Sequence, residues 1–148
     1  MIAEEKLFNQ IKTFLQVEHF AVLATQGEEY PYCSLVGYAS TADCKEVLFA
    51  TDRQTHKYEN LVNNPKVSML IDSQTNQEND FKDAQALTIL GSAREVDIDE
   101  HPEYLTLYLK KHPALKEFVT SPDCALIKIV VDKYIMVTDF QDVQECSM

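Results

Sequence analysis

The fold is decided by the stretch from Phe49 to Asp72, which reads FATDRQTHKYENLVNNPKVSMLID. It begins inside a short apolar run, residues 47–50, that is rich in strand-forming side chains. This run ends at Thr51 and Asp52, whose side-chain oxygens compete for backbone hydrogen bonds. A second apolar run follows further along at residues 67–72. The stretch therefore predicts two strands joined by a polar turn and a short intervening segment.

The intervening segment has the pattern of a helix. From Thr55 onward apolar side chains recur at helical spacing, at Tyr58, Leu61 and Val62. Either Thr55 or Asp52 can cap the free N–H groups of the first turn. Asn63-Asn64-Pro65 ends the helix, because proline restricts the residue before it and cannot continue the hydrogen-bond ladder.

The start of this helix combines features that suit an anion. A helix N-terminus presents unpaired N–H groups, and here it carries the Thr55 hydroxyl, the Lys57 ammonium and, close by, Arg53. Such a site is well suited to phosphate. The alternative interpretation is that Thr55 is only a cap and Lys57 only a solvated surface charge.

The same stretch resembles the phosphate-binding segment of the pyridoxamine 5'-phosphate oxidase-like, FMN-binding split-barrel superfamily. The resemblance rests on Thr51, Thr55 and Lys57, then Asn60-Leu61, and then Asn64-Pro65 before an apolar strand. It extends through the order of elements from about Phe20 to about Phe140. It implies a mainly β fold with peripheral helices, a six-stranded FMN-binding split β-barrel, and a homodimer with FMN in each of two interfacial clefts.

The resemblance also implies which residues contact the cofactor. In the superfamily the isoalloxazine ring lies along the second strand, which here corresponds to Tyr32, Cys33, Ser34 and Leu35. The phosphate would be held by Thr55, Lys57 and the backbone N–H of His56, while Thr51 and Asp52 would reach the ribityl chain or the phosphate. The second strand also resembles that of the haem-utilisation-type subgroup. Without the family, it reads as an ordinary barrel strand with alternating burial.

Departures from the residue motifs of the family narrow the range of activities expected for this chain. Pyridoxamine phosphate oxidases carry Arg and Lys on the second strand and a C-terminal Trp, whereas this strand reads Ser34-Leu35-Val36 and the chain has no Trp. Haem-degrading relatives use a C-terminal histidine, which residues 141–148 lack. We therefore expect an FMN-binding oxidoreductase of unknown substrate. The alternative is a non-enzymatic flavin or haem binding or sensing protein, and a deazaflavin could replace FMN.

Composition sets the class of protein. The 148 residues fit one domain, and 13 Lys+Arg against 24 Asp+Glu give a net charge of -11, which disfavours nucleic acid as a partner. The acidic N-terminus does not read as a signal peptide, and no apolar run reaches membrane-spanning length. We expect a cytoplasmic protein. We expect no metal site, since no two cysteines have zinc-ligand spacing among Cys33, Cys44, Cys124 and Cys146.

The rest of the chain reads as strands flanked by helices. We expect an N-terminal helix at 1–17, a hairpin at 20–38, an exposed polar loop at 73–83 and a strand at 86–96 with a bulge at Gly91. Two His-Pro pairs, 101–102 and 112–113, read as helix starts, with the histidines in structural capping roles. Residues 125–138 form a strand pair or one long bent strand, and a short acidic tail occupies 141–148.

Overall fold

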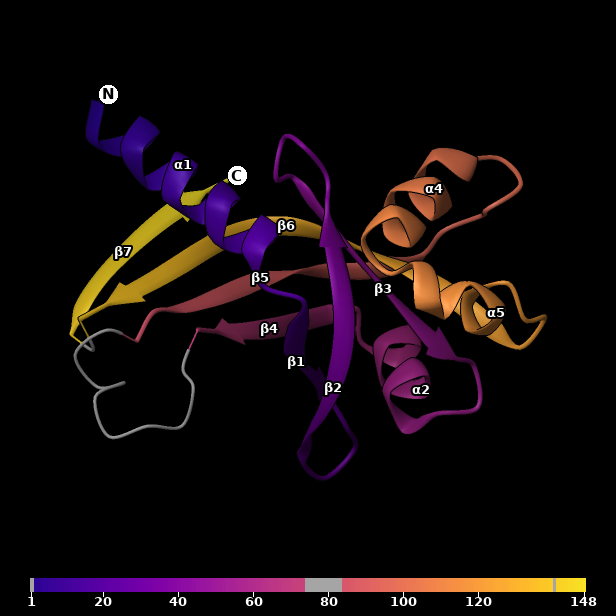
Figure 1. Ribbon diagram of the computed structural model, residues 1–148. Helices are drawn as coiled ribbons and strands as arrows, with labels where there is room; N and C mark the ends of the chain where they lie inside the picture. The colour runs from indigo at the N-terminus through magenta and orange to yellow at the C-terminus, as the bar shows by residue number, and fades with distance from the viewer. Residues whose placement is uncertain (1, 74–83, 140) are drawn as a thin grey trace.

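The computed structural model describes residues 2–73, 84–139 and 141–148. Its elements, in chain order, are α1 (Ile2–Val17), β1 (Phe20–Gln26), β2 (Pro31–Ser40), β3 (Glu46–Asp52), α2 (His56–Asn63), β4 (Lys66–Asp72), β5 (Ala86–Glu95), α4 (Pro102–Lys111), the 3-10 turn η1 (Pro113–Leu115), α5 (Lys116–Val119), β6 (Cys124–Thr138) and β7 (Asp142–Ser147) (Figure 1). The strand–turn–helix–strand prediction for Phe49 to Asp72 is confirmed.

Six antiparallel strands close into a barrel. Neighbours follow the order β3-β2-β1-β4-β5-β6, and β6 returns to pair with β3. The two halves of β6 have different partners, because Cys124–Val130 pairs with β3 and Lys133–Thr138 pairs with β7. Closure leaves no open edge within the ring of six strands. The predicted mainly β split-barrel fold with peripheral helices is confirmed.

Burial on both faces explains the continuous apolar run of β3. Val47 and Phe49 belong to the core inside the barrel, whereas Leu48 and Ala50 belong to a second core cluster that includes Tyr108 of α4. α4 packs against β2 and β3 on the outside of the barrel (Figure 1). A strand covered on both faces has no reason to alternate apolar with polar residues.

The predicted bulge at Gly91 is confirmed by a shift in register between β5 and β6 at Leu90 and Gly91. A Cβ atom at residue 91 would overlap the carbonyl oxygen of Val130 and crowd Ile129. Only glycine allows β6 to approach this closely, so the bend of the barrel depends on it.

Several boundaries differ from those predicted. Residues 141–148 are not simply a tail, because Asp142–Ser147 adds β7 to the outer half of β6. The alternatives for 125–138 resolve into one strand. Pro102 starts α4 as predicted, whereas Pro113 starts a 3-10 turn before α5. Most of the loop predicted at 73–83 lies outside the described residues.

Candidate functional site

The N-terminus of α2 is shaped by Thr55, which occupies the N-cap position. Its hydroxyl accepts a hydrogen bond from the Tyr58 N–H at 3.3 Å and donates one to the Asp52 carbonyl at 2.9 Å. The Asp52 carboxylate accepts from the Gln54 N–H at 2.8 Å. Of the two caps that the sequence allowed, Thr55 caps the helix, and Asp52 orders the turn that leads into it.

Thr51 lies under this turn rather than on its surface. Its side chain is buried, with 1% exposed, and its hydroxyl oxygen lies 3.0 Å from that of Thr55. The Thr51 hydroxyl also lies 3.2 Å from the Asp52 carbonyl, which accepts from it. The two threonines therefore fix the shape of the turn, and Thr51 presents little surface to a ligand.

Two N–H groups of the first helical turn remain without an acceptor in the described part of the chain, those of His56 and Lys57. The first bond within the turn runs from the Glu59 N–H to the Thr55 carbonyl at 3.2 Å. The Lys57 side chain is half-buried, and no ion pair is formed by it within the ranges the structure describes. Two unpaired N–H groups at a helix N-terminus, in a turn whose sequence also carries a lysine, fit a phosphate group.

The predicted ring-binding strand, β2, divides its residues between two faces. Tyr32 and Ser34 share the side that continues into the barrel with Val36, whereas Cys33 and Leu35 are exposed on the opposite side. The centroid of the Tyr32 ring lies 5.9 Å from that of the His56 ring, so β2 starts beside the N-terminus of α2. A planar group lying along β2 would contact one pair of these side chains and only the backbone of the other.

Ser34 has an unsatisfied hydroxyl. Its Oγ atom is buried and has no hydrogen-bond partner among the described residues. An unpaired buried hydroxyl is uncommon and calls for an explanation. It lies on β2 two residues from Tyr32, within the segment assigned to the cofactor.

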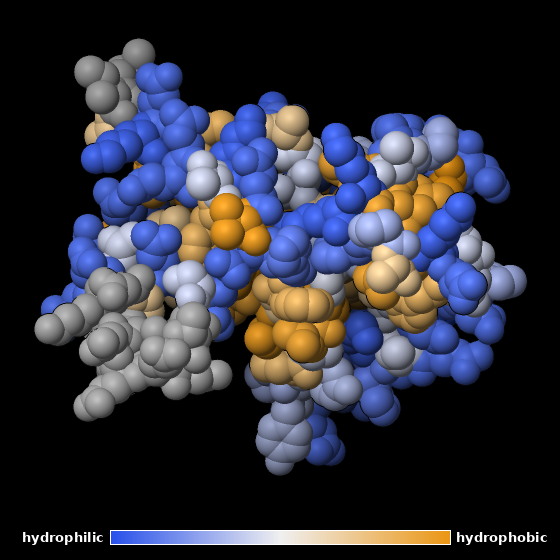
Figure 2. Space-filling model, viewed as in Figure 1, coloured by the Kyte–Doolittle hydropathy of each residue, from blue (hydrophilic) through white to orange (hydrophobic). Residues whose placement is uncertain are grey.

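The exposed side of β2 belongs to an apolar surface. Leu35 pairs with Val22 of β1, which pairs with Leu70 of β4, so the three side chains form a row across three strands. Leu35 is 70% exposed and nearby Phe20 is 63% exposed. Figure 2 shows hydrophobic side chains gathered over β1 and β2 in the middle of this face. We call Phe20, Val22, Leu35 and Leu70 the outer apolar row.

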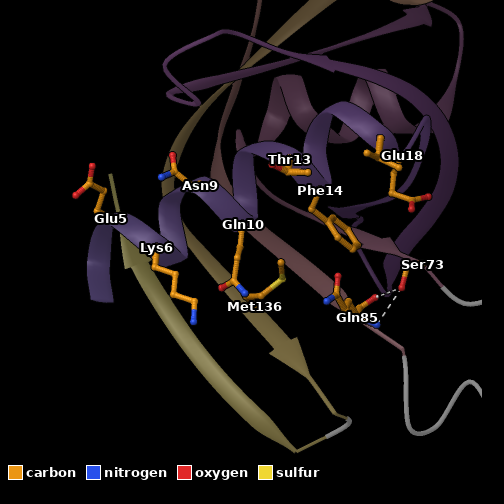
Figure 3. A pocket seen from close by; sticks show the side chains of 11 residues that line it. Glu5, Lys6, Asn9, Gln10, Thr13, Phe14, Glu18, Ser73, Gln85 and Met136 are labelled. Carbon is orange, nitrogen blue, oxygen red and sulfur yellow. Dashed lines mark hydrogen bonds between the residues drawn. The ribbon is translucent and has the colours of Figure 1, made fainter. Parts of the chain in front are cut away.

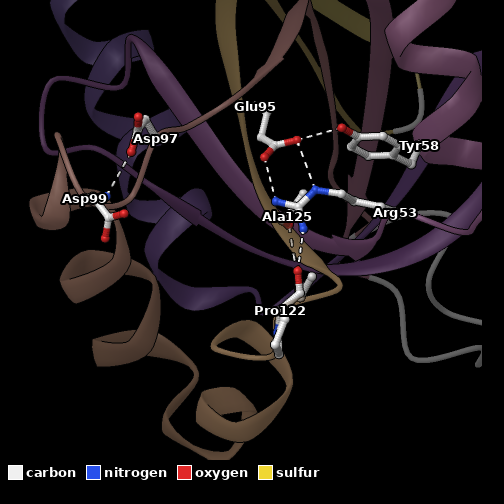
Figure 4. A network of polar contacts seen from close by, with 8 residues as sticks. Arg53, Tyr58, Glu95, Asp97, Asp99, Pro122 and Ala125 are labelled. Atoms are coloured by element: carbon white, nitrogen blue, oxygen red, sulfur yellow. Dashed lines mark hydrogen bonds and ion pairs between the residues drawn. The ribbon is translucent and has the colours of Figure 1, made fainter.

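Arg53 does not join Lys57 at the start of α2. Its guanidinium donates to the Glu95 carboxylate at 2.7 Å and to the Pro122 carbonyl at 2.8 Å, and the Tyr58 hydroxyl donates to Glu95 at 2.6 Å (Figure 4). The Arg53 hydrogen bond holds the pKa of Glu95 below its ordinary value, and Glu95 in turn raises the pKa of Arg53. No local pattern in the sequence predicts this network, because Glu95 is 42 residues from Arg53.

The two histidines that precede prolines do not act as side-chain caps. His101 and His112 occupy the predicted N-cap positions, but neither side chain makes a cap hydrogen bond. The Nε2 atom of His112 instead lies 2.7 Å from the Tyr38 carbonyl. No group of three or more His, Cys, Asp or Glu side chains is arranged to hold a metal ion in the part of the chain that the structure describes.

A separate cavity of about 740 Å³ lies between α1 and the ends of neighbouring strands. Phe14 and Met136 form apolar parts of its wall, and Ser73 and Gln85, which are hydrogen-bonded to each other, lie at its edge (Figure 3). None of the predicted cofactor residues lines it. It is thus distinct from the site at α2.

Comparison with known proteins agrees with this fold. The profile of the family described as Pyridoxamine 5'-phosphate oxidase matches residues 7–138, which is most of the chain. The chain belongs to this family. No curated protein sequence matches it. Among the described residues of this pyridoxamine 5'-phosphate oxidase family member, no helix is both long and apolar enough to span a membrane.

Solved structures share the fold of this family member at low sequence identity. General Stress Protein 26 from Bacillus anthracis is 23% identical with a TM-score of 0.71, and the similarity covers 100% of each chain. A FAD-binding protein from Mesorhizobium loti is 14% identical with a TM-score of 0.69, covering 86% of this chain and 91% of that one. A haem-binding protein from Mycobacterium smegmatis is 17% identical with a TM-score of 0.79; the similarity covers 92% of this chain but only 56% of that longer chain.

Proposed function

We propose that this protein binds FMN, with the phosphate at the N-terminus of α2 and the isoalloxazine ring along β2. The observation that carries the proposal is the pair of unpaired N–H groups of His56 and Lys57 at the start of α2, in a turn that also carries the Lys57 side chain. The Tyr32 ring lies next to His56, so the strand assigned to the ring begins where the phosphate site ends. Family membership and the FAD-binding relative support a flavin.

The residues of this chain would hold the cofactor by its phosphate and by one side of β2. Backbone N–H groups and the Lys57 ammonium would form charge-assisted hydrogen bonds to the phosphate oxygens. Ser34 supplies a hydroxyl without a partner among the described residues, suited to a polar atom of a ligand. When bound, FMN would supply hydride and electron transfer, and the protein would supply position and electrostatics. We propose an oxidoreductase whose substrate is unknown.

We propose further that two copies associate through the outer apolar row. Leu35 and Phe20 are large apolar side chains with most of their surface exposed in the single chain. The row is continuous across β2, β1 and β4, and contiguous exposed apolar surface of this kind marks interaction sites. A second copy would cover the row and the exposed side of β2, giving the homodimer that the family resemblance implies.

Titration with FMN and with riboflavin tests the cofactor. Binding of FMN, detected by quenching of flavin fluorescence, with clearly weaker binding of riboflavin would support the proposal. Absence of FMN binding at micromolar concentration would contradict it. Parallel titration with haemin tests the rival ligand, to which the haem-binding relative draws attention. Oxidation of reduced nicotinamide cofactor with an artificial acceptor would separate an oxidoreductase from a flavin-binding or sensing protein.

A further inference from the structure

The last turn of α4 is joined to the barrel by a dense polar junction. The Tyr108 hydroxyl donates to the Gly37 carbonyl at 3.0 Å, and the His112 Nε2 atom lies 2.7 Å from the Tyr38 carbonyl. Lys111 donates to the Leu15 carbonyl at 2.9 Å, near the end of α1. We call the contacts of Tyr108, Lys111 and His112 the α4 junction. It ties α4 to β2 and to α1.

The geometry fixes the tautomer of neutral His112. A carbonyl oxygen only accepts, so Nε2 must carry the proton in the contact with Tyr38. Neutral His112 therefore has its unprotonated nitrogen at Nδ1, and acid would add the second proton there. The ring packs against Gly37, where a Cβ atom would lie 3.2 Å from Cε1 and 3.5 Å from Nδ1. Among the described residues, no acceptor faces Nδ1 to receive that proton.

The charges around the ring also oppose protonation. The groups that face it are Lys111 of α4, His19 at 6.4 Å between ring centroids, the Tyr108 ring at 5.0 Å, and Tyr38 of β2. The Lys111 ammonium sits 3.9 Å from the Tyr38 ring centroid, and Glu18 is the carboxylate that faces this ammonium. Burial, together with Lys111 and His19, lowers the pKa of His112 against the opposing effect of the hydrogen bond to the Tyr38 carbonyl, and burial lowers the pKa of Lys111 to about 8.

We propose that the α4 junction is an acid-sensitive latch, in which protonation of His112 at Nδ1 loosens α4 from β2. The cation that forms would keep its bond to the Tyr38 carbonyl, but it would lie beside Lys111 and its new Nδ1–H would have no acceptor among the described residues. Separation of α4 from the barrel would relieve both problems. The effect would reach β2 at Gly37 and Tyr38, on the same strand as Tyr32 to Leu35. The latch does not depend on the identity of the cofactor.

The direction of the effect follows from linkage. Because the folded-state pKa of His112 is lowered, the unfolded chain binds more protons between the folded-state value and the ordinary value of about 6.5. The contribution of neutral His112 to the free energy of unfolding is fully present above about pH 6.5. It is lost as the pH falls through the folded-state pKa. The loss should start as released mobility of α4 rather than as global unfolding.

The test compares the parent with His112→Gln, in which the amide can still donate to the Tyr38 carbonyl but cannot gain a proton. Between about pH 7.5 and about pH 5, the fall in melting temperature should be smaller in the variant by about 2–4 °C. His101→Gln changes an exposed histidine at the other end of α4, whose Nδ1 lies 3.4 Å from the Glu103 carboxylate, and its melting temperature should fall at least as much as that of the parent. Equal falls for the parent and His112→Gln would overturn the proposal.

Two measurements on the unmodified protein keep the proposal testable if His112→Gln does not fold. Histidine NMR should show the Nε2–H tautomer for His112 at neutral pH and a titration midpoint below about 6.5. Hydrogen exchange, corrected for intrinsic rates, should accelerate on acidification for the amides of α4 before those of β5 and β6. A His112 midpoint at or above about 6.5, or acceleration that is uniform over the chain, would overturn the latch.

Discussion

The Tyr58 hydroxyl donates a 2.6 Å hydrogen bond to the carboxylate of Glu95, 37 residues further along the chain. This bond joins α2 to the end of β5, and the same carboxylate binds Arg53 at the turn before α2. The orientation of the turn at the candidate phosphate site therefore depends on Arg53 and Tyr58, which line a hollow together with Thr55.

Tyr58→Phe should lower the free energy of unfolding by about 1 kcal/mol, because it deletes one hydrogen bond to a partly exposed carboxylate. Urea denaturation followed by circular dichroism measures the change. Tyr30→Phe, at a tyrosine that is 76% exposed, serves as the matched control and should leave stability within about 0.5 kcal/mol. Equal stability of Tyr58→Phe and the parent would contradict a stabilising role for the Tyr58–Glu95 bond.

Acid should weaken the Arg53–Glu95 network. The pKa of Glu95 is lowered in the folded state, so its contribution is present above its unfolded-state pKa and is lost as the pH falls through the lower folded-state value. The free energy of unfolding should therefore fall less in Glu95→Gln than in the parent between about pH 6 and about pH 3. Glu100→Gln, at an exposed carboxylate, should follow the parent. Parallel curves for Glu95→Gln and the parent would contradict the assignment.

Lys57→Ala should weaken FMN binding by about one to two powers of ten, because it removes a charge-assisted bond worth about 1.5–3 kcal/mol. Riboflavin, which lacks the phosphate, should bind the variant and the parent almost equally. Fluorescence titration of both ligands measures the difference. Lys110→Ala, at an exposed lysine of α4, controls for the general loss of positive charge. An unchanged FMN affinity in Lys57→Ala would remove Lys57 from the site, and equal loss of both ligands would indicate a damaged fold.

Leu35→Lys should convert the proposed dimer into a monomer, because it places a charge at the most exposed side chain of the outer apolar row. Sedimentation velocity at micromolar concentration, with FMN present, measures the change. The melting temperature of the isolated chain should change little, since Leu35 is 70% exposed. Phe118→Lys, at an apolar residue of α5 that is 43% exposed, should remain dimeric. A parent protein that sediments only as a monomer would contradict the dimer.

Gly91→Ala should destabilise the barrel by about 1–3 kcal/mol or more, because the new methyl group would overlap the Val130 carbonyl. Gly37→Ala should cost less, since its Cβ would meet a side-chain ring at 3.2 Å instead of backbone. Thermal denaturation compares the two variants. The reverse order would mean that β6 can shift at the bulge more easily than His112 can move.

The sequence predicted the parts of the fold that have local causes. The cap at Thr55, the end of α2 before Pro65 and the bulge at Gly91 each follow from the chemistry of one or two residues. It did not predict β7, because an exposed and mostly polar strand has no apolar pattern to announce it. Its place is determined by β6, which offers a free edge beyond the barrel.

The residues of the candidate site likewise divide into those whose positions have local causes and those whose positions do not. Lys57 and His56 lie at a helix start, as their spacing predicted, while Arg53 was assigned to the same anion-binding region by proximity in sequence alone. Its guanidinium turns instead to Glu95. The burial of Thr51 was equally hidden, because a threonine at a strand end can point into a turn or out of it. Both outcomes depend on contacts with residues distant in sequence.

The two halves of β6 have different roles: one closes the barrel by pairing with β3, and the other pairs with the added strand β7. Cys124–Val130 already completes the barrel by pairing with β3. The pairing of β7 with the rest of β6 is therefore not needed to close it. The pairing that closes the ring is therefore independent of the residues after Thr138, although Cys146 of β7 packs against the core cluster. A barrel closed in this way can gain new recognition elements after its last barrel strand without a change in the order of its strands.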